Sequence, residues 1–503
     1  MKWKLISSLA LLFTVELSAQ TPTDALRLSY QTLGGGSARS MGVGSAIGAL
    51  GADFTAVGIN PAGLASYRTS EIVFGPGLSQ VRTNSVLKDK TVVNTSRQDQ
   101  STRFFLSNLA LIGCIKPVKG NWLTHNWTVG FNRLNTFNGS YYFNGESRGS
   151  IVNRFLEKAN KGGSLNSFEE GLAKETGAIY RKDVSVPYRS DFDGYNDVPI
   201  VKSQQGETSG RVNEMIFGYA ANYREKLQIG AVIGVPFIRF SDNRIYRETD
   251  TETATDLGRI PAFKELKFWE NYNVSGTGIN ARLGFIYKPT YALRLGLAAH
   301  TPTRYFLSEG YNNSLNYQYL DVNSSGGLIE GNQTSRSPQG AFDYKINTPW
   351  RFTASSSYVI GKHGFISADA DFINYSRMNF EYGIEDKDAQ QAVNLDIRRD
   401  YTSNVNLRFG AEIVSDIFRF RGGIATIGLP SKSANTGYFE NAAKMFSLGA
   451  GIRENRFFFD LAFQFIRTSD VFSPYQVSSD YPSTVVNRTR NNSLIAATLG
   501  FKF

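Results

Sequence analysis

Residue types that carry enzyme chemistry are scarce in this chain of 503 residues. It contains one cysteine, Cys114, and three histidines, His125, His300 and His363. A single cysteine excludes an intrachain disulfide, a cysteine-ligated iron–sulfur cluster and a cysteine-rich zinc site. No G-x-S-x-G nucleophile motif lies near any of the histidines. We therefore expect no enzyme: no catalytic residues, no metal site and no cofactor.

Arginine is the charged residue whose spacing indicates a binding role. Six arginines lie on the polar faces of segments in which apolar and polar residues alternate, namely Arg282, Arg294, Arg408, Arg419, Arg421 and Arg453. Glu412 and Asp460 are their candidate partners. One interpretation is an arginine–carboxylate network that braces the interior. The other is that one arginine, with Arg282, Arg294 and Arg408 as the candidates, holds a ligand carboxylate through two parallel hydrogen bonds.

The composition indicates a membrane β-barrel. The net charge of +10 is spread out, without the basic run that would indicate nucleic-acid binding. The chain has 36 Phe, 25 Tyr and 48 Gly, and 19% of its residues are charged, against about 25% in a typical soluble domain. No apolar run reaches the roughly 18 residues that a membrane-spanning helix needs. These features exclude a helical membrane bundle and favour an all-β fold.

The N-terminus has the pattern of a secretory signal peptide. Lysines at positions 2 and 4 precede an apolar stretch over residues 5–15, and Ser18-Ala19 follows it. We expect residues 1–19 to be removed, so that the mature chain begins near Gln20 and works outside the inner membrane. With a barrel fold, this predicts a location in the cell outer membrane, in contact with its lipids.

The C-terminal segment alternates as a transmembrane strand does. Counting back from Phe503, every second residue is apolar as far as Ile495, and Lys502, Gly500 and Thr498 lie between them. A terminal Phe on such a strand also resembles the signal for outer-membrane barrel assembly. We therefore expect the barrel-assembly machinery to bind the strand that ends at Phe503.

Alternating segments recur along the chain and predict an antiparallel transmembrane barrel. We count fourteen strands, at roughly 71–81, 103–115, 126–143, 212–224, 227–240, 278–288, 291–305, 348–360, 363–376, 403–414, 417–427, 444–453, 456–467 and 491–503. Short turns alternate with long connections of roughly 16 to 68 residues. An even strand number, with short periplasmic turns and long external loops, is typical of outer-membrane barrels.

Residues 20–70 precede the first predicted strand and are rich in small residues. Fourteen strands enclose a lumen that side chains alone do not fill, since about eight strands is the size that they fill. We therefore predict that residues 20–70 form a hatch inside the lumen of a barrel formed by residues 71–503.

The segment 37–65 resembles the N-terminal hatch of the FadL/TodX family of outer-membrane transporters for long-chain fatty acids and other hydrophobic compounds. The matching residues are Ala38, Arg39, Met41, Gly42, Gly44, Ala46, Ala49, Asp53, Ala56, Asn60, Pro61, Ala62, Gly63 and Leu64. The resemblance covers the mature chain in architecture, but its motifs lie in the hatch alone. It implies a fourteen-stranded barrel, in agreement with the strand count, and hatch residues Arg39, Asp53, Asn60, Pro61, Ala62 and Gly63.

Two interpretations of the Asn60-Pro61-Ala62 motif stay open. Pro61 favours an extended residue before it, and Asn60 is suited to cap its own turn. The motif then serves only to hold the shape of a structural plug. Alternatively, it also moves with a substrate or lines its path.

The long loops contain apolar segments with helical spacing. Ser167 with Glu170 predicts a capping box at one helix start. A second predicted loop contributes Phe263, Leu266 and Trp269. Exposed apolar faces must bury against something: either the two loops pack on each other, or they also form a groove where an amphipathic ligand docks. The predicted ligand-binding residues of these loops are Phe155, Phe168, Leu172, Phe263, Leu266 and Trp269.

Glycines in the third predicted strand indicate a bend. Gly130 suggests a bulge, and Asn138-Gly139 follows it. Relatives in the resembling family kink this strand to open a side door in the wall. We expect an ordinary strand end here.

These features together predict an outer-membrane channel for passive uptake of hydrophobic molecules such as long-chain fatty acids. Loop capture, lumen binding and a hatch movement would follow one another. The alternative is a FadL-like barrel that shuttles protein cargo in type IX secretion. Such relatives tend to have Lys after Asn-Pro-Ala, whereas this chain has Gly63-Leu64, which favours the transporter.

Overall fold

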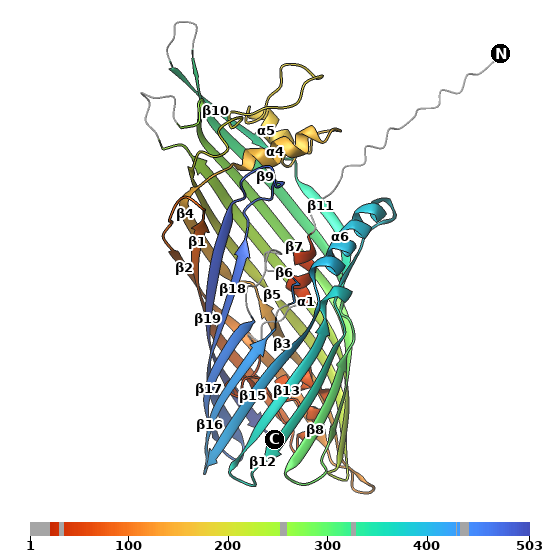
Figure 1. The fold of residues 1–503 in the computed structure, drawn as a ribbon. Coiled ribbons are helices and arrows are strands. Elements are labelled where there is room, and N and C mark those ends of the chain that lie inside the picture. Colours follow the sequence, from red (N-terminus) through yellow and green to blue (C-terminus); the bar gives the residue numbers. More distant parts are fainter. Residues whose placement is uncertain (1–20, 30–34, 252–258, 323–327, 429, 433–441) are drawn as a thin grey trace, which may run out of the picture.

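A computed structural model describes residues 21–29, 35–251, 259–322, 328–428, 430–432 and 442–503; the predicted signal peptide at 1–19 lies outside them. In this part of the chain, nineteen antiparallel strands form one sheet that closes on itself (Figure 1). Several strands continue one another along the same line of the wall, and we call each such line a stave. The wall has fourteen staves, which confirms the predicted fold class.

Ten staves consist of a single strand: β1 (Glu71–Lys88), β2 (Arg97–Ile115), β5 (Ile200–Tyr223), β6 (Leu227–Thr249), β7 (Phe263–Tyr287), β15 (Ser403–Ser415), β16 (Phe418–Ile427), β17 (Ala443–Arg453), β18 (Phe457–Phe472) and β19 (Val485–Lys502). Four are composite: β3 (Trp122–Thr136) with β4 (Gly139–Ser147), β8 (Leu293–His300) with β9 (Arg304–Val322), β10 (Leu328–Arg336) with β11 (Gly340–Asn347) and β12 (Arg351–Val359), and β13 (Gly364–Asn374) with β14 (Asn379–Glu381).

Closure is made by the first and last strands. In β1, Glu71 lies opposite Lys502 of β19 on one side and opposite Ile112 of β2 on the other. A closed barrel leaves no unpaired sheet edge in the bilayer, where unsatisfied backbone groups are costly. The terminal Phe503 is 73% exposed. Its proposed recognition by the barrel-assembly machinery stays a prediction.

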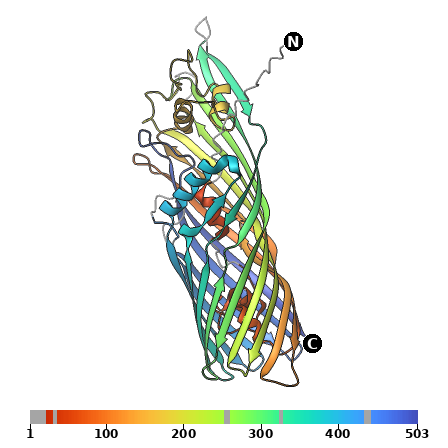
Figure 2. The same ribbon diagram turned by 90° about the vertical axis from the view of Figure 1, so that its right-hand side faces the viewer.

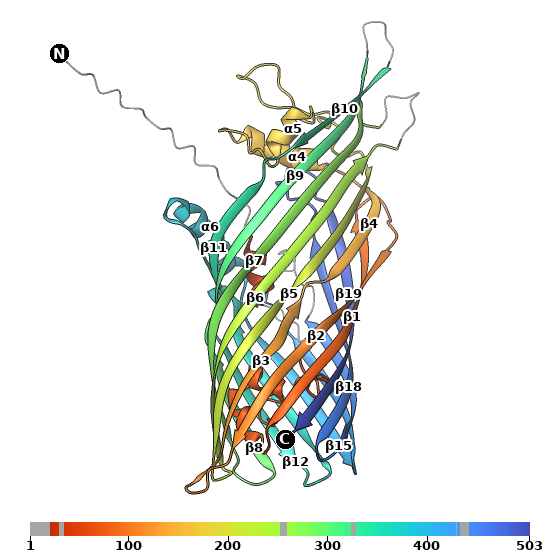
Figure 3. The same cartoon turned by 180° about the vertical axis from the view of Figure 1, so that it is seen from behind.

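All fourteen predicted strands are present, but several run much further outward than predicted. β5, β6 and β7 are 24, 23 and 25 residues long, and their outer parts rise well above the opposite wall (Figures 1 and 3). The predicted second loop is wrong, because Phe263–Trp269 is the outer end of β7. These ends lack a lipid-facing side, so they do not show the regular alternation that identifies a transmembrane strand.

The alternation of side chains follows the bilayer. In β7, Leu283 and Phe285 point outward and are 56% and 48% exposed, whereas Arg282 points inward and is 5% exposed. An outward apolar band with a polar interior is what a membrane-spanning barrel requires. Within the described residues, no helix is both long and apolar enough to cross a membrane.

Three groups of helices accompany the barrel (Figures 1 and 2). Inside the lumen lie α1 (Pro22–Ser29), α2 (Ala38–Gly42), α3 (Phe54–Ile59) and the short 3-10 helix η1 (Pro61–Ser66), as the predicted hatch requires. At the outer mouth lie α4 (Ile151–Asn160) and α5 (Glu170–Glu175). On the flank, η2 (Tyr375–Arg377), η3 (Ile384–Asp386) and α6 (Lys387–Asp400) connect β13 and β14 to β15.

A charge on the outward band should destabilise the barrel. Leu283→Arg places a guanidinium in the hydrocarbon, and we expect the free energy of unfolding in phospholipid vesicles to fall by about 2–4 kcal/mol. Ile329→Arg is the matched control, because Ile329 is 50% exposed on β10 at the outer end and should change stability little. Equal effects of both changes in urea titrations would contradict the assigned membrane position.

Candidate functional site

The hatch packs directly against barrel backbone through inward-facing glycines. A Cβ added to Gly284 would lie 2.0 Å from Oδ1 of Asn60, and one added to Gly230 would lie 2.4 Å from the carbonyl oxygen of Pro61. The strand glycines of β6 and β7 therefore make room for the Asn60-Pro61 step. Glycine occurs at these inward positions of the strands because the backbone of the hatch approaches the strand backbone closely there.

The opposite wall receives the hatch in the same way. Added Cβ atoms on Gly410 of β15 and Gly423 of β16 would each lie 2.2 Å from a hatch backbone atom, in Val43 and Gly44 respectively. Ser367 of β13 also donates to the carbonyl oxygen of Ala46, at 2.6 Å. The hatch is therefore held between two walls of the barrel rather than attached to one.

The predicted hatch residues are mostly engaged within the hatch. Asn60 caps η1, because its Oδ1 accepts from the N–H of Ala62, and its Nδ2 donates to the carbonyl of Gly48 at 2.8 Å. Pro61 is the first residue of η1. Asp53 caps α3, and it accepts a 2.6 Å hydrogen bond from Ser37. These contacts position the motif.

Gly63 and Arg39 both contact the middle of the hatch, at Gly51 and Ala52. The carbonyl of Gly63 accepts from the N–H of Ala52 at 3.1 Å. The guanidinium of Arg39 donates to the carbonyls of Gly51 and Ala52, at 3.2 and 2.8 Å. Whether Arg39 or any other hatch residue moves with a ligand stays a prediction.

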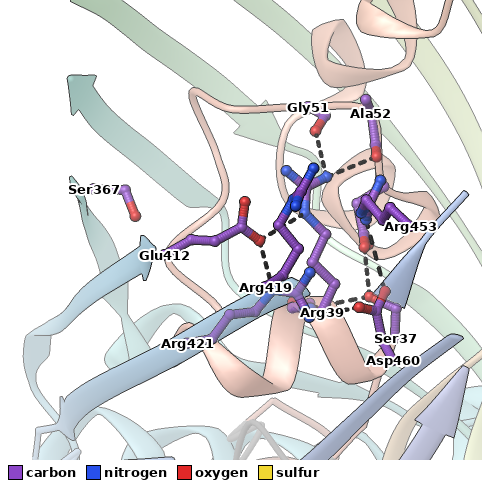
Figure 4. Close-up of polar contacts among 12 residues, drawn as sticks. Ser37, Arg39, Gly51, Ala52, Ser367, Glu412, Arg419, Arg421, Arg453 and Asp460 are labelled. Atoms are coloured by element: carbon purple, nitrogen blue, oxygen red, sulfur yellow. Dashed lines mark hydrogen bonds and ion pairs between the residues drawn. The ribbon is translucent and has the colours of Figure 1, made fainter. Parts of the chain in front are cut away.

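A chain of alternating charges ties the hatch to the wall (Figure 4). Glu412 lies between Arg421, at 2.6 Å, and Arg39, at 3.9 Å. Arg421 also contacts Asp460 at 2.6 Å, and Arg453 lies 3.6 Å from the other oxygen of Asp460. Each buried charge has an opposite charge beside it, which is the condition for burying ions. Of the six arginines predicted from the sequence, Arg421 and Arg453 thus pair with Glu412 and Asp460, whereas Arg419 donates to backbone carbonyls of the adjacent turn instead.

The three candidate headgroup arginines differ in their surroundings. Arg408 contacts Asp371 at 2.7 Å and Asp369 at 3.7 Å. Arg282 pairs with Glu214. Arg294 donates to the carbonyl of Leu50 at 2.9 Å. Arg408 is thus held between two carboxylates. Each of the three has one buried nitrogen without a hydrogen-bond partner among the described residues, namely Nη1 of Arg282, Nε of Arg294 and Nε of Arg408. Arg282 differs because, of the three, it lines the cavity described next.

A cavity of about 60 Å³ lies in the lumen between α1 and α3 of the hatch and the barrel wall. Arg282, His300 and Arg351 supply its cationic or basic side, and Gly58 of α3 contributes to its floor. His300 contacts the carbonyl oxygen of Ile59 at 2.8 Å. The apolar side is made by residues that the sequence did not single out, namely Leu28, Leu134, Tyr305 and Ile373. Ser29, Asn280, Thr301, Thr303 and Thr348 also line it, so the cavity combines cationic groups with a wall that is partly apolar and partly polar.

The barrel wall is broken in the third stave. β3 ends at Thr136 and β4 begins at Gly139. The ladder between β2 and β3 stops at the Asn108–Asn132 pair, and among the described strands no ladder joins β4 to β2. Phe104, in the part of β2 that has no partner on this side, is 87% exposed. The expected ordinary strand end is wrong, because Asn138-Gly139 marks a break in the wall (Figure 3).

The predicted bulge at Gly130 is also wrong. The register of β3 against β5 shifts elsewhere, between Trp122 and Thr124 and between Arg133 and Asn135. Gly130 instead makes room for the hatch, since an added Cβ would lie 2.4 Å from the ring of Phe54. The start of the hatch contacts β2 near the break, where the Gly36 N–H donates to Ser107 at 2.8 Å.

The outer mouth is covered by α4, α5 and their loops, which we call the cap. Of the predicted ligand-binding residues, Phe155, Leu172, Phe263 and Leu266 are at most 2% exposed and lie in one core. Phe155 packs edge-on against Phe268 at 5.7 Å. These four side chains form no open groove, so a docking role requires the cap to open.

The other two predicted residues lie at the edge of the cap. Phe168 is half-buried and contacts Tyr311, with ring centroids 4.8 Å apart. Trp269 is half-buried on β7, one residue after the buried Phe268, so it points to the opposite face of the strand. Ligand binding by both stays a prediction.

Salt bridges hold the two helices of the cap together. Glu169 contacts Arg154 of α4 at 2.6 Å and Lys158 at 2.5 Å. Burial opposes ionisation of Glu169, but these two cations outweigh it and lower the pKa of the carboxyl. The predicted capping box at Ser167 is wrong: α5 begins at Glu170, whose carboxylate accepts from the N–H of residue 166.

A buried polar cluster in the cap has no sequence signal. Lys202 is 0% exposed, and it donates to Tyr475, Thr484 and the carbonyl of Arg148 at 2.7–3.1 Å. Burial lowers the pKa of Lys202 to about 8. Glu248 accepts from the N–H of the first residue of α4 at 2.9 Å. These bonds join loops that are distant in sequence.

Loss of Arg421 should destabilise the barrel strongly. Arg421→Met leaves Glu412 and Asp460 without their central cation, and removal of one partner of a buried pair costs about 3–5 kcal/mol. Arg419→Met, two residues away on β16, is the control, because Arg419 donates to backbone carbonyls of the adjacent turn. Urea unfolding in vesicles measures both. Equal stability of the two variants would contradict the bracing role.

Acid should loosen the cap. Because the pKa of Glu169 is lower in the folded protein, its salt bridges contribute fully above the unfolded pKa of about 4.3 and are lost as the pH falls through the lowered value. We expect amide-exchange protection of α4 to decrease from pH 6 to pH 3. Glu169→Gln should be less protected at pH 6 and nearly independent of pH. Glu175→Gln, at an exposed position, is the control and should keep the pH profile of the wild type. The same wild-type profile in Glu169→Gln would contradict the role of the Glu169 salt bridges.

No protein-family model matches the chain, and no curated protein sequence matches it. Solved structures do. A Pseudomonas aeruginosa FadL homologue aligns with a TM-score of 0.56 and 12% identity, over 94% of this chain and 100% of that one. The Pseudomonas putida toluene transporter TodX aligns with a TM-score of 0.50 and 13% identity, over 94% and 100%. The chain therefore has the fold of these outer-membrane barrels, a closed fourteen-stave wall around an N-terminal hatch.

Proposed function

We propose that the protein is an outer-membrane channel for passive uptake of hydrophobic molecules, with long-chain fatty acids as the substrate class. The observation that carries this proposal is the lumen cavity that α1 and α3 of the hatch form with the barrel wall. There the guanidinium of Arg282, whose buried Nη1 has no hydrogen-bond partner among the described residues, lies beside apolar side chains. This combination fits the carboxylate and the first methylenes of an amphipathic chain.

The cavity is small in this closed state, so entry requires movement. α1 lies above the cavity, and Ala25, Leu26 and Leu28 are buried among the lumenal aromatic and aliphatic side chains. A substrate arriving from the cap would replace these contacts with similar apolar contacts of its own. The exchange of one apolar surface for another lowers the cost of moving α1.

The break in the third stave supports a sideways exit. It lies beside the start of the hatch, through the contact between Gly36 and Ser107. The Asn108 amide next to it is buried and has no hydrogen-bond partner among the described atoms. A hatch shift at Gly36 would connect the lumen to the bilayer, where a hydrophobic molecule is more stable than in water.

Structural likeness supports a hydrophobic substrate but does not specify a long-chain fatty acid. The TodX structure is described as that of a toluene transporter, and toluene has no carboxylate. The buried guanidinium of Arg282 favours an anionic head for the substrate of this chain. Comparison of a fatty acid with its uncharged methyl ester separates these two possibilities.

Filling the cavity should block binding. Gly58 is on the floor, and an added Cβ would meet no atom closer than 3.7 Å, so Gly58→Leu extends into the cavity without breaking an ion pair. We expect palmitate affinity, measured by calorimetry in detergent, to fall at least tenfold. Gly58→Ala, which adds one methyl group, is the matched control.

Uptake into proteoliposomes should fall in parallel with affinity. Wild-type protein should bind palmitate more tightly than its methyl ester, whereas Gly58→Leu should bind both weakly. Unchanged palmitate affinity in a folded Gly58→Leu barrel would overturn the assigned site. Equal affinity of the wild type for acid and ester would remove the proposed role of Arg282.

A further inference from the structure

A large groove lies on the outside of the barrel wall. It has a volume of about 490 Å³ and lies across β12, β13, β15, β16 and β17. Its rim is formed by large apolar side chains of the lipid-facing band, each between 45% and 57% exposed, namely Tyr358, Ile366, Phe409, Ile424 and Phe446. Because the groove opens within the apolar band, the medium in front of it is hydrocarbon.

Small residues form the floor of the groove. Ala411 lies opposite Ile366 on one side and opposite Gly422 on the other, and Ala368 lies opposite Phe409 in the next row. The large outward side chains of the rim surround these small residues. The floor is therefore lower than its surroundings by the depth of a side chain.

Gly422 is a glycine that neither packing nor backbone conformation requires. An added Cβ would meet no atom within 4 Å, and Gly422 is not among the residues with positive φ. Its strand neighbour Gly423 differs, because it makes room for Gly44 of the hatch. Glycine within a strand weakens it. The feature that Gly422 does provide is the open floor of the groove.

The groove lies in the periplasmic half of the membrane band. Gly422 is four residues from the start of β16 at Phe418, and Ala411 is four residues from the end of β15 at Ser415. A short turn connects these two strand ends. Tyr358 is the last residue but one of β12, so its phenol lies near the interface where aromatic side chains meet lipid headgroups.

We propose that this groove binds one acyl chain of a phospholipid from the periplasmic leaflet of the outer membrane. The hydrophobic effect does not favour binding within a bilayer, because both the groove and the acyl chain are already out of water. Van der Waals packing therefore determines whether an acyl chain stays in the groove. An empty groove would forfeit dispersion contacts along its whole lining. A lipid chain seated between Phe409, Ile424 and Tyr358 gains contacts on several sides, and lipid on the flat band gains them on one side.

The site is also close to the hatch. Ser367 lines the groove and donates to the carbonyl of Ala46 on the lumenal side, at 2.6 Å. Gly423, which also lines the groove, contacts Gly44 of the hatch. A single layer of strand backbone therefore separates the bound acyl chain from the hatch. The proposal depends only on the membrane position of the barrel and not on its proposed transport function.

Native mass spectrometry of the purified full-length barrel, incubated with palmitoyl-oleoyl phosphatidylethanolamine in mild detergent, tests the site. The groove is filled by Gly422→Leu combined with Ala411→Leu. Ala231→Leu, an exposed outward position of β6, adds a leucine to the band outside the groove and is the matched control. Heat-modifiable mobility on gels verifies that each variant is folded.

Wild type and Ala231→Leu should each retain one phospholipid more than the double variant at the same activation energy. Equal retention by all three proteins would overturn the proposal. So would a dimer that is lost in the double variant, since the groove would then hold a second copy of the chain. If the double variant does not fold, Gly422→Leu alone decides the test, because its first added atom meets no neighbour.

Discussion

The width of the barrel is the constraint on which the rest of the structure depends. A bilayer requires every backbone group of a spanning sheet to be paired, and closure of the strands meets that requirement. Closure with fourteen staves leaves a lumen that side chains alone do not fill. The chain fills it with its own N-terminal segment. The inward glycines, the buried ion pairs and the position of the cavity all follow from the need to hold that segment.

The hatch is held by two kinds of contact with different consequences. Gly230, Gly284, Gly410 and Gly423 bring hatch backbone against wall backbone, so shape determines the fit. The chain of charges through Glu412 and Asp460 is buried and closely paired, so breaking it is costly. The charges lie near α2, whereas the cavity borders α3 and α1. Movement at the cavity therefore need not break the charge network.

Sequence periodicity predicted the transmembrane part of the fold because the bilayer imposes it. A lipid-facing residue such as Leu283 must be apolar and its inward neighbour Arg282 need not be, so the alternation is readable. Above the membrane that constraint ends. Phe263–Trp269 was therefore assigned to a loop although it continues β7, and α6 was not predicted. The glycines on polar faces were visible in the sequence, but their reason required the position of the hatch.

The site was predicted less completely than the fold. Arg282 was among the candidate arginines, yet no local pattern distinguishes it from Arg408, which lies between two aspartates. The partners of Arg282 in the cavity come from distant strands and from α1, and only the folded barrel brings them together. Likewise, the apolar spacing of the loops predicted burial, but not that Phe155 and Leu266 would both lie in one core.

The central claim is that the lumen above the hatch holds an amphipathic molecule with its charged head at Arg282. An electron cryomicroscopy map of the barrel, extracted gently from its own outer membrane, tests this claim most directly. The account predicts elongated density in the lumen that begins beside Arg282 and continues past Leu28 and Tyr305. An empty lumen, with a protein partner bound at the mouth instead, would contradict it.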